Sequence, residues 1–466
     1  MKTRKTYLYL GLPVAGILFY LCYLHKAAID VVYSDYIRLI NSYLPDVWTP
    51  DKFFVPDVLT RIPVNYLERI INVGLFGYSV SFDRLLGVLG FGLSALLIGS
   101  YCRKQRIRTG WYVILMVIMF SLNKWEMLYN GTGWAHFLAF ACFFYHYLVL
   151  DRVYKGREHR GDKIRLAVLP AVISLGIAGP YCAIYTVTLL LAYGFILVSD
   201  RLLERRKASR TVTGAQIAGF VFCAVCPFFL YLLSNSAAVY EYSGAAEGSM
   251  ITAFFQEPEF FLKFFLKSFA SMVFGVEFIE RRLAAIPGVC WCILGVMVLA
   301  SYFLALWMNF YYGICEKTIF PLMLLAGGGM NHLMVLVSRW IFMPNDMYGM
   351  SSRYALQYQI GILGILLTFA LAFGRGAKKS AKTGIRLLAF AVTAMFLLGN
   401  LATSAEEWNF AKHRKNSNIE RREKLLNFEE MDEEELKAVL EYRKPGTKEA
   451  LCILKENGWN IFREEK

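Results

Sequence analysis

The chain contains few charged residues for its length of 466, because only 18% of them are Asp, Glu, Lys or Arg. Soluble domains usually carry about 25%, so a soluble fold of this size would lack the charge that its surface needs. The sequence also lacks a P-loop, an H-E-x-x-H or G-x-S-x-G motif and a dinucleotide fingerprint. Without these motifs, the sequence gives no support for an enzyme that binds soluble nucleotides.

The ten cysteines give no disulfide framework, because most of them lie within apolar segments. Cys223 and Cys226 precede Pro227 in one such segment, where small apolar side chains of a helix explain them more simply than redox or zinc chemistry. The net charge of +14 is divided among short loops and does not gather on one face or tail. We therefore expect no nucleic-acid partner.

Apolar segments recur along the whole chain, and 57% of its residues are apolar. A helix needs about 20 such residues to cross a bilayer, so the pattern predicts an all-α polytopic membrane protein with about eleven transmembrane helices. The predicted spans are residues 7–25, 85–102, 110–123, 134–150, 166–180, 182–199, 212–234, 286–308, 318–337, 355–374 and 386–402. No A-x-A-like cleavage site follows the first span, which we interpret as a retained anchor.

Lys and Arg gather in every second gap between these spans. The gaps at 1–6, 103–109, 151–165, 200–211, 309–317 and 375–386 contain 24 Lys/Arg and 6 Asp/Glu, whereas the rest of the chain contains 26 and 30. The positive-inside rule places these gaps and the N-terminus in the cytoplasm. We therefore predict a plasma-membrane domain over residues 1–402, with its active face outside the cell, and a small helical tail over 403–466, also outside.

The first predicted outer loop, residues 26–84, contains Asp30 and Asp35 within about ten residues of a span end, so both carboxylates lie near the membrane surface. Apolar residues from 64 to 76 recur at three- and four-residue steps, which predicts an amphipathic helix on the bilayer surface. Asp57 and Arg61 precede this helix. The alternative is a structured linker in which Asp and Arg side chains pair with one another.

Further polar residues lie at other predicted outer mouths. Lys124, Glu126 and His136 belong to the hairpin between the third and fourth spans, where Trp and Tyr are interpreted as interface anchors. His136 has a second interpretation as a hydrogen-bonded structural residue. The Phe-rich stretch 254–278 of the third outer loop, residues 235–283, is interrupted by Lys263, Lys267 and Glu277, and these three charges favour a surface-lying or re-entrant helix over a span.

Arg353 and Tyr354 open a late span at the outer surface, where the orientation rule does not favour positive charge. A guanidinium at this depth can bind a phosphate through two parallel hydrogen bonds, or it can extend to lipid headgroups. His332 lies within the preceding span.

These features together resemble the GT-C superfamily of polytopic glycosyltransferases. The shared elements are a cytoplasmic N-terminus, one span, a long first outer loop with early acids at Asp30 and Asp35, surface helices in that loop, and an Arg353–Tyr354 pair at a later outer mouth. The resemblance implies an outward-facing enzyme of cell-envelope polysaccharide biosynthesis. It would transfer a sugar from a polyprenyl-phosphate or polyprenyl-diphosphate donor to a glycan, polymer or protein acceptor, in contact with membrane lipids.

An acceptor hydroxyl that attacks such a donor needs a carboxylate as general base, and we predict Asp35 in this role, with Asp30 as the second choice. The donor phosphate needs cations, and we predict Arg353, helped by Arg61 or Lys124. The side chains predicted to contact or support the acceptor are Glu126, His136, His332, Tyr354 and Asp57. The sequence leaves open a divalent cation, Mg²⁺ or Mn²⁺, between phosphate and carboxylate.

Other functions also fit outward-facing polar loops. A polysaccharide polymerase or ligase would use the same lipid-linked glycans, although such enzymes more often concentrate Arg and His in a large late loop. A lipid-linked glycan transporter or flippase usually needs charged residues within the spans, and these spans are nearly free of charge. An accessory scaffold would tolerate replacement of each outer acid singly.

Overall fold

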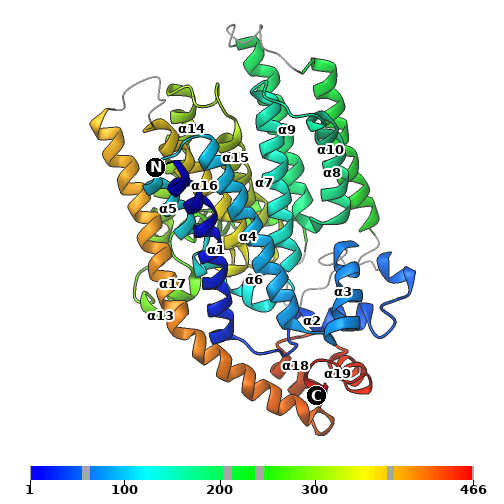
Figure 1. Ribbon diagram of the computed structural model, residues 1–466. Helices are drawn as coiled ribbons and strands as arrows, with labels where there is room; N and C mark the ends of the chain where they lie inside the picture. Colours follow the sequence, from blue (N-terminus) through cyan, green and yellow to red (C-terminus); the bar gives the residue numbers. More distant parts are fainter. Residues whose placement is uncertain are drawn as a thin grey trace.

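The computed structural model describes residues 2–54, 63–202, 212–236, 246, 248–374 and 382–463. Within these ranges all regular elements are helices, and ten helices are long and apolar enough to cross a membrane. They stand side by side in a bundle, and the short helices over residues 35–43, 63–76, 433–440 and 447–456 lie at one end of it (Figure 1). The predicted fold class, an all-α polytopic membrane protein, is confirmed.

The long elements are α1 (Lys2–Ala27), α4 (Val80–Lys104), α5 (Thr109–Met119) continued by η2 (Leu122–Lys124) and α6 (Trp125–Asn130), α7 (Trp134–Tyr154), α9 (Cys182–Leu202), α10 (Gly214–Ser234), α14 (Gly288–Tyr311), α15 (Phe320–Arg339), α16 (Ala355–Ala372) and α17 (Thr383–Leu426). The shorter helices are α2 (Asp35–Tyr43), α3 (Pro63–Phe76), α8 (Asp162–Gly176), α11 (Met250–Gln256), α12 (Pro258–Ala270), α13 (Val276–Arg282), α18 (Glu433–Leu440) and α19 (Thr447–Glu456).

The predicted span at 166–180 is the one that does not appear among the ten. It falls on α8, whose 15 residues measure about 22 Å, less than the ~30 Å of a bilayer core. The chain nevertheless returns along α8 to the level where α7 began, because the ring of Tyr181 lies 4.6 Å from that of His136. The eleventh crossing of the bundle therefore exists, made by a helix shorter than a usual span.

Segments predicted to share the inner side meet at one end of the bundle. The hydroxyl of Tyr101 lies 3.0 Å from that of Thr318, which donates a 2.7 Å hydrogen bond to the Asp151 carboxylate. Tyr9 donates to the carbonyl of Ile107 at 3.2 Å. The basic loops next to these residues are therefore neighbours, as alternate crossings require.

At the opposite end, the first loop and the C-terminal tail share a second hydrophobic core. Figure 1 shows α18 and α19 beside α2. The helix α17 runs without a break through residue 402, so the predicted boundary there marks a change of polarity inside one helix of 44 residues. The tail thus lies at the same end as the first loop. The most buried side chains of this core include Val31, Ile37, Ile40, Leu425, Leu436, Leu440, Leu451 and Leu454.

The amphipathic helix predicted at 64–76 is α3, and it is oriented with its polar face toward the protein. Arg69 lies buried and pairs with Asp83 of α4 at 2.9 Å, while Leu67, Ile71 and Leu75 are exposed. An apolar face turned away from the protein suits a helix on a bilayer surface. The ion pair therefore anchors this helix to the bundle through its polar side.

The Phe-rich stretch of the third outer loop forms α11 and α12, and α12 packs directly on α14. A Cβ at Gly295 would overlap the carbonyl oxygen of Leu266, so the two helices meet backbone to backbone at this glycine. One face of α12 is inserted in the bundle, while Leu262 on the other face is exposed. The buried aromatic residues of this face are Phe260, Phe261, Phe264 and Phe269.

Candidate functional site

A cavity of about 370 Å³ lies at the end of the bundle that carries the first loop and the tail. Its walls come from α2, α3, α6, α7, α15, the turn η7 (Ser352–Tyr354) and the loop between α18 and α19. Predicted outer segments far apart in the sequence therefore share one cavity. Its charged lining residues are Asp35, Arg38, Glu126, Arg339, Arg353 and Lys444.

Asp35 is the first residue of α2, and the residue before it has an unusual backbone. Ser34 has φ 53°, a region that non-glycine residues rarely occupy, and its N–H donates a 2.6 Å hydrogen bond to the carbonyl of Leu440. Such conformations persist where the surroundings hold them and are frequent at functional sites. The tail thus fixes the point from which the Asp35 side chain enters the cavity.

The Asp35 carboxylate interacts electrostatically with Arg353 and His136, which also line the cavity. Over the described ranges no donor forms a hydrogen bond to it. A carboxylate in this state can accept a hydrogen bond from a bound hydroxyl group without giving up a protein partner. This is the property that a general base needs.

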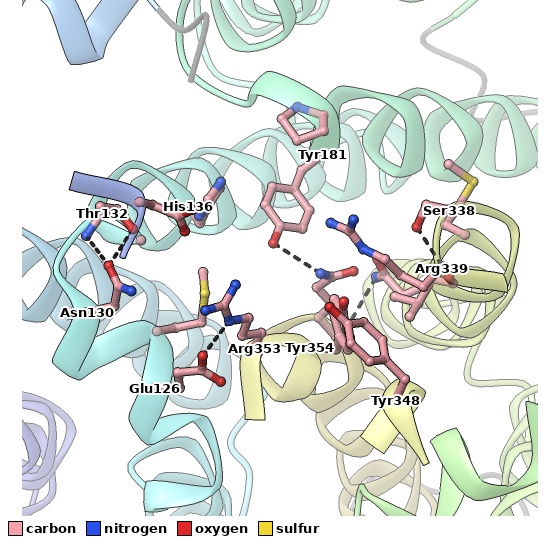
Figure 2. Close-up of a pocket in the computed structure, with 18 of the residues that line it drawn as sticks. Glu126, Asn130, Thr132, His136, Tyr181, Ser338, Arg339, Tyr348, Arg353 and Tyr354 are labelled. Atoms are coloured by element: carbon pink, nitrogen blue, oxygen red, sulfur yellow. Dashed lines mark hydrogen bonds and ion pairs between the residues drawn. The ribbon is translucent and has the colours of Figure 1, made fainter. Parts of the chain in front are cut away.

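Arg353 belongs to the turn η7, which leads into α16. Its Nε–H donates to Glu126, and its side chain is 41% exposed. The two terminal NH₂ groups have no hydrogen-bond partner in the described part of the chain. Figure 2 shows the guanidinium beside Glu126, among the residues that line the cavity. Four N–H donors in a planar fork thus remain for a ligand, and this geometry matches phosphate or carboxylate oxygens.

Glu277 of α13 does not line the cavity but is connected to it through Ser352 and Glu126, although the sequence did not single it out as a functional residue. The Ser352 hydroxyl oxygen lies 3.0 Å from Glu126 Oε2 and 2.9 Å from Glu277 Oε1. One hydroxyl hydrogen can serve only one carboxylate, so both contacts are hydrogen bonds only if one of the two acids is protonated. Removal from water raises the pKa of Glu277 to about 7, and the charge of Glu126 adds to this effect. Glu277 is therefore the acid that holds the proton.

Glu277 should make stability depend on pH. Because its pKa is raised in the fold, the neutral carboxyl contributes stability that is fully present below pH 4.5 and lost as the pH rises through 7. We expect wild-type protein to lose about 1–3 kcal/mol over this interval from this group, and Glu277→Gln to remove that loss. Thermal unfolding in detergent between pH 5 and pH 8 measures the difference.

The matched control is Glu280→Gln, which removes an exposed carboxylate from the same helix. The charged groups that interact with Glu277 are Glu126, Arg281 and Arg414. An unchanged pH profile in Glu277→Gln, or an equal change in both variants, would contradict the assignment of the proton to Glu277.

Aromatic and polar side chains complete the cavity beside Arg353. His136 lines it with its ring against Tyr181, whose hydroxyl accepts a 3.0 Å hydrogen bond from Gln357. The guanidinium of Arg339 lies 6.0 Å from the ring centre of Tyr354. Figure 2 shows His136, Tyr181, Arg339 and Tyr354 around the same space. Such a lining suits a ligand with both ring surfaces and polar groups.

Asp30, the second choice for a general base, does not line the cavity. Its carboxylate accepts hydrogen bonds from the Val80 N–H at 2.7 Å, the Ser79 hydroxyl at 2.5 Å and the Asn460 side chain at 3.2 Å. It thus caps the start of α4 and joins it to the tail. This is a structural role, because its oxygens already have these donors.

Lys124 and His332 also lie away from the cavity lining. The Lys124 ammonium is buried and donates to the carbonyls of Met119 at 2.7 Å and Ser121 at 3.0 Å. The His332 ring is buried between Phe269 and Tyr358, with ring centres 3.7 and 4.0 Å away. Both side chains have structural partners in place of a ligand. Two further predicted residues, Asp57 and Arg61, lie outside the described residues.

A divalent cation would have few protein ligands in this cavity. Across the described residues, no group of three or more His, Cys, Asp and Glu side chains could hold a metal ion. Glu126 is engaged with Arg353, which leaves Asp35 as the carboxylate with free oxygens. A bound cation would therefore depend on Asp35 together with oxygens of the substrate.

No protein-family model, curated protein or solved structure matches the chain.

Proposed function

We propose that this protein is a membrane glycosyltransferase that moves a sugar from a polyprenyl-phosphate-linked donor to a cell-envelope acceptor on the outer face of the membrane. One observation carries the proposal: the unbonded carboxylate of Asp35 and the open fork of Arg353 line the same cavity. A base for the acceptor and a cation for the donor phosphate are the two groups that this transfer needs.

The reaction follows from these two side chains. The acceptor hydroxyl donates a hydrogen bond to Asp35 and gives its proton to the carboxylate, while the hydroxyl oxygen bonds to the anomeric carbon of the donor sugar. The bond from that carbon to the phosphate oxygen breaks, and its electrons remain on the polyprenyl phosphate. Arg353, with Arg339 on the same cavity, stabilises the charge that develops there. One carboxylate suffices if the transfer inverts the anomeric centre.

The surroundings of the cavity support a lipid-linked donor. Met334 and Ser338 of α15 line the cavity, and the neighbouring Leu333 and Val337 are 41% and 50% exposed on the outside of the helix. A polyprenyl chain could therefore lie along this apolar surface while its phosphate reaches Arg353. The charge bias of the loops, +18 on the predicted inner side and −4 elsewhere, supports an outward-facing cavity.

The test is a transfer assay with purified full-length protein in lipid nanodiscs. Polyprenyl phosphates and diphosphates that carry a radiolabelled sugar are incubated with cell-envelope glycans, and the label that leaves the lipid fraction is counted. Label in the glycan, lost when the enzyme is omitted, supports the proposal. In liposomes, movement of intact labelled lipid across the bilayer without cleavage would favour a flippase and overturn it.

A polysaccharide polymerase or ligase is the second candidate, because Arg339 at the end of α15 and Arg353 in the turn before α16 both come from a late part of the chain and line the cavity. The same assay with a lipid-linked oligosaccharide distinguishes the two functions. A polymerase or ligase transfers the whole oligosaccharide, whereas the proposed glycosyltransferase transfers one sugar.

A further inference from the structure

The C-terminal tail contributes a wall of the cavity through the loop that joins α18 to α19. This loop follows α2 for about two turns, because Ser34 bonds the carbonyl of Leu440 at 2.6 Å and the Asn41 side chain donates to the carbonyl of Gly446 at 3.0 Å. Lys444, between these two points, lines the cavity. The tail is thus part of the site, and α2 and this loop form a single wall.

The charges on this wall are arranged around the proposed base. Arg38 lies three residues after Asp35, on the same face of α2, and also lines the cavity. Lys444 is exposed and has no ion-pair or hydrogen-bond partner within the described ranges. A substrate hydroxyl bonded to Asp35 would therefore have Arg38 within about one helical turn, or roughly 5 Å along the axis, and Lys444 on the same wall of the cavity.

The charges of the cavity are more numerous than a donor phosphate requires. Four cations and two carboxylates line it, and one carboxylate, Glu126, is paired with Arg353. A donor phosphate at Arg353 and Arg339 would occupy the wall formed by α15 and η7. The cations of the α2 wall would then face the acceptor, which must reach Asp35 from that side.

We propose that Arg38 and Lys444 bind an anionic group of the acceptor, a phosphate or a carboxylate, close to the hydroxyl that receives the sugar. This inference rests on the proposed function and specifies its acceptor as an acidic glycan or polyol phosphate. The two cations orient the acceptor so that its hydroxyl reaches Asp35, while the donor phosphate occupies the opposite wall.

The test measures binding of three soluble probes to purified full-length protein by isothermal titration calorimetry. The probes are a phosphorylated disaccharide, a uronate-containing disaccharide and the corresponding neutral disaccharide, and the first two distinguish a phosphate from a carboxylate. We expect at least one acidic probe to bind about tenfold more tightly than the neutral one at low salt and to lose this advantage at high salt. Lys444→Gln should weaken the acidic probe about tenfold and leave the neutral one unchanged.

The matched control is Arg443→Gln, which removes the neighbouring exposed cation that does not line the cavity. Equal affinity for acidic and neutral probes, or equal effects at 443 and 444, would overturn the inference. So would acidic binding that is lost in Arg353→Gln and kept in Lys444→Gln, because the anion would then occupy the donor wall.

The binding measurement separates this inference from the proposed function. It needs no lipid donor, so a protein that binds acidic probes through Lys444 but transfers no sugar from any donor would refute the transferase proposal alone. Conversely, active transfer to neutral acceptors that is indifferent to Lys444→Gln would refute the acidic acceptor and leave the transferase proposal standing.

Discussion

Asp35→Asn is expected to reduce sugar transfer by about 100- to 10,000-fold, the range that a positioned general base contributes. The asparagine side chain keeps the size of the carboxylate but cannot take a proton from the acceptor hydroxyl. Over the described ranges no protein hydrogen bond depends on the Asp35 carboxylate, so the variant should fold and enter the membrane in wild-type amounts. The transfer assay together with quantification of the protein in membranes measures both effects.

Asp30→Asn is the informative comparison, because Asp30 and Asp35 are the same residue type and lie in the same short segment. An asparagine at position 30 can still accept the N–H of Val80 at the start of α4, so this variant should keep most of its transfer activity. Loss of transfer in Asp30→Asn with full transfer in Asp35→Asn would reverse the assignment of the base. Full activity in both would remove the carboxylates from the mechanism.

The sequence could not distinguish these two acids, because what separates them comes from distant parts of the chain. The Asp30 carboxylate is occupied by Ser79 and by Asn460, which lies 430 residues away. Nothing in the local pattern around residue 30 reveals those partners. The convergence of Asp35 and Arg353, in contrast, was predictable, because alternate crossings of the bundle bring all outer mouths to one end and the charge pattern identifies those mouths.

Other parts of the site depended on packing that hydropathy does not encode. Lys124 lies in the same hairpin as Glu126, yet its ammonium is buried against backbone carbonyls next to the break in the helix at residues 120–121. Glu277 enters the site because α13 lies against the mouth of α16, where Ser352 reaches it. The composition of the tail does not reveal that it packs on the first loop. Its apolar residues complete the core of that loop and thereby place Lys444 beside α2.

Arg353→Gln is expected to raise the KM for the lipid-linked donor by about 10- to 100-fold and to lower kcat as well. Each charge-assisted hydrogen bond to a phosphate contributes about 1.5–3 kcal/mol, and the developing charge on the leaving phosphate would lose its nearest cation. The donor KM and kcat of Arg353→Lys should lie between those of Arg353→Gln and wild type, since lysine keeps the charge but not the planar fork. Initial rates over a range of donor concentrations measure these effects.

Arg353 has a second role, as the partner of Glu126, and Glu126→Gln separates it from phosphate binding. If the guanidinium serves the donor, removing the carboxylate leaves all of its donors for the phosphate, and the KM for the donor should stay the same or fall. If Arg353 serves only to neutralise Glu126, Arg353→Gln and Glu126→Gln should both lose activity and thermal stability. The donor KM should then change to the same extent in the two variants. A donor KM that rises in Arg353→Gln but does not rise in Glu126→Gln would therefore assign Arg353 to the donor phosphate, because loss of an ion pair that serves folding alone would affect both variants in the same way.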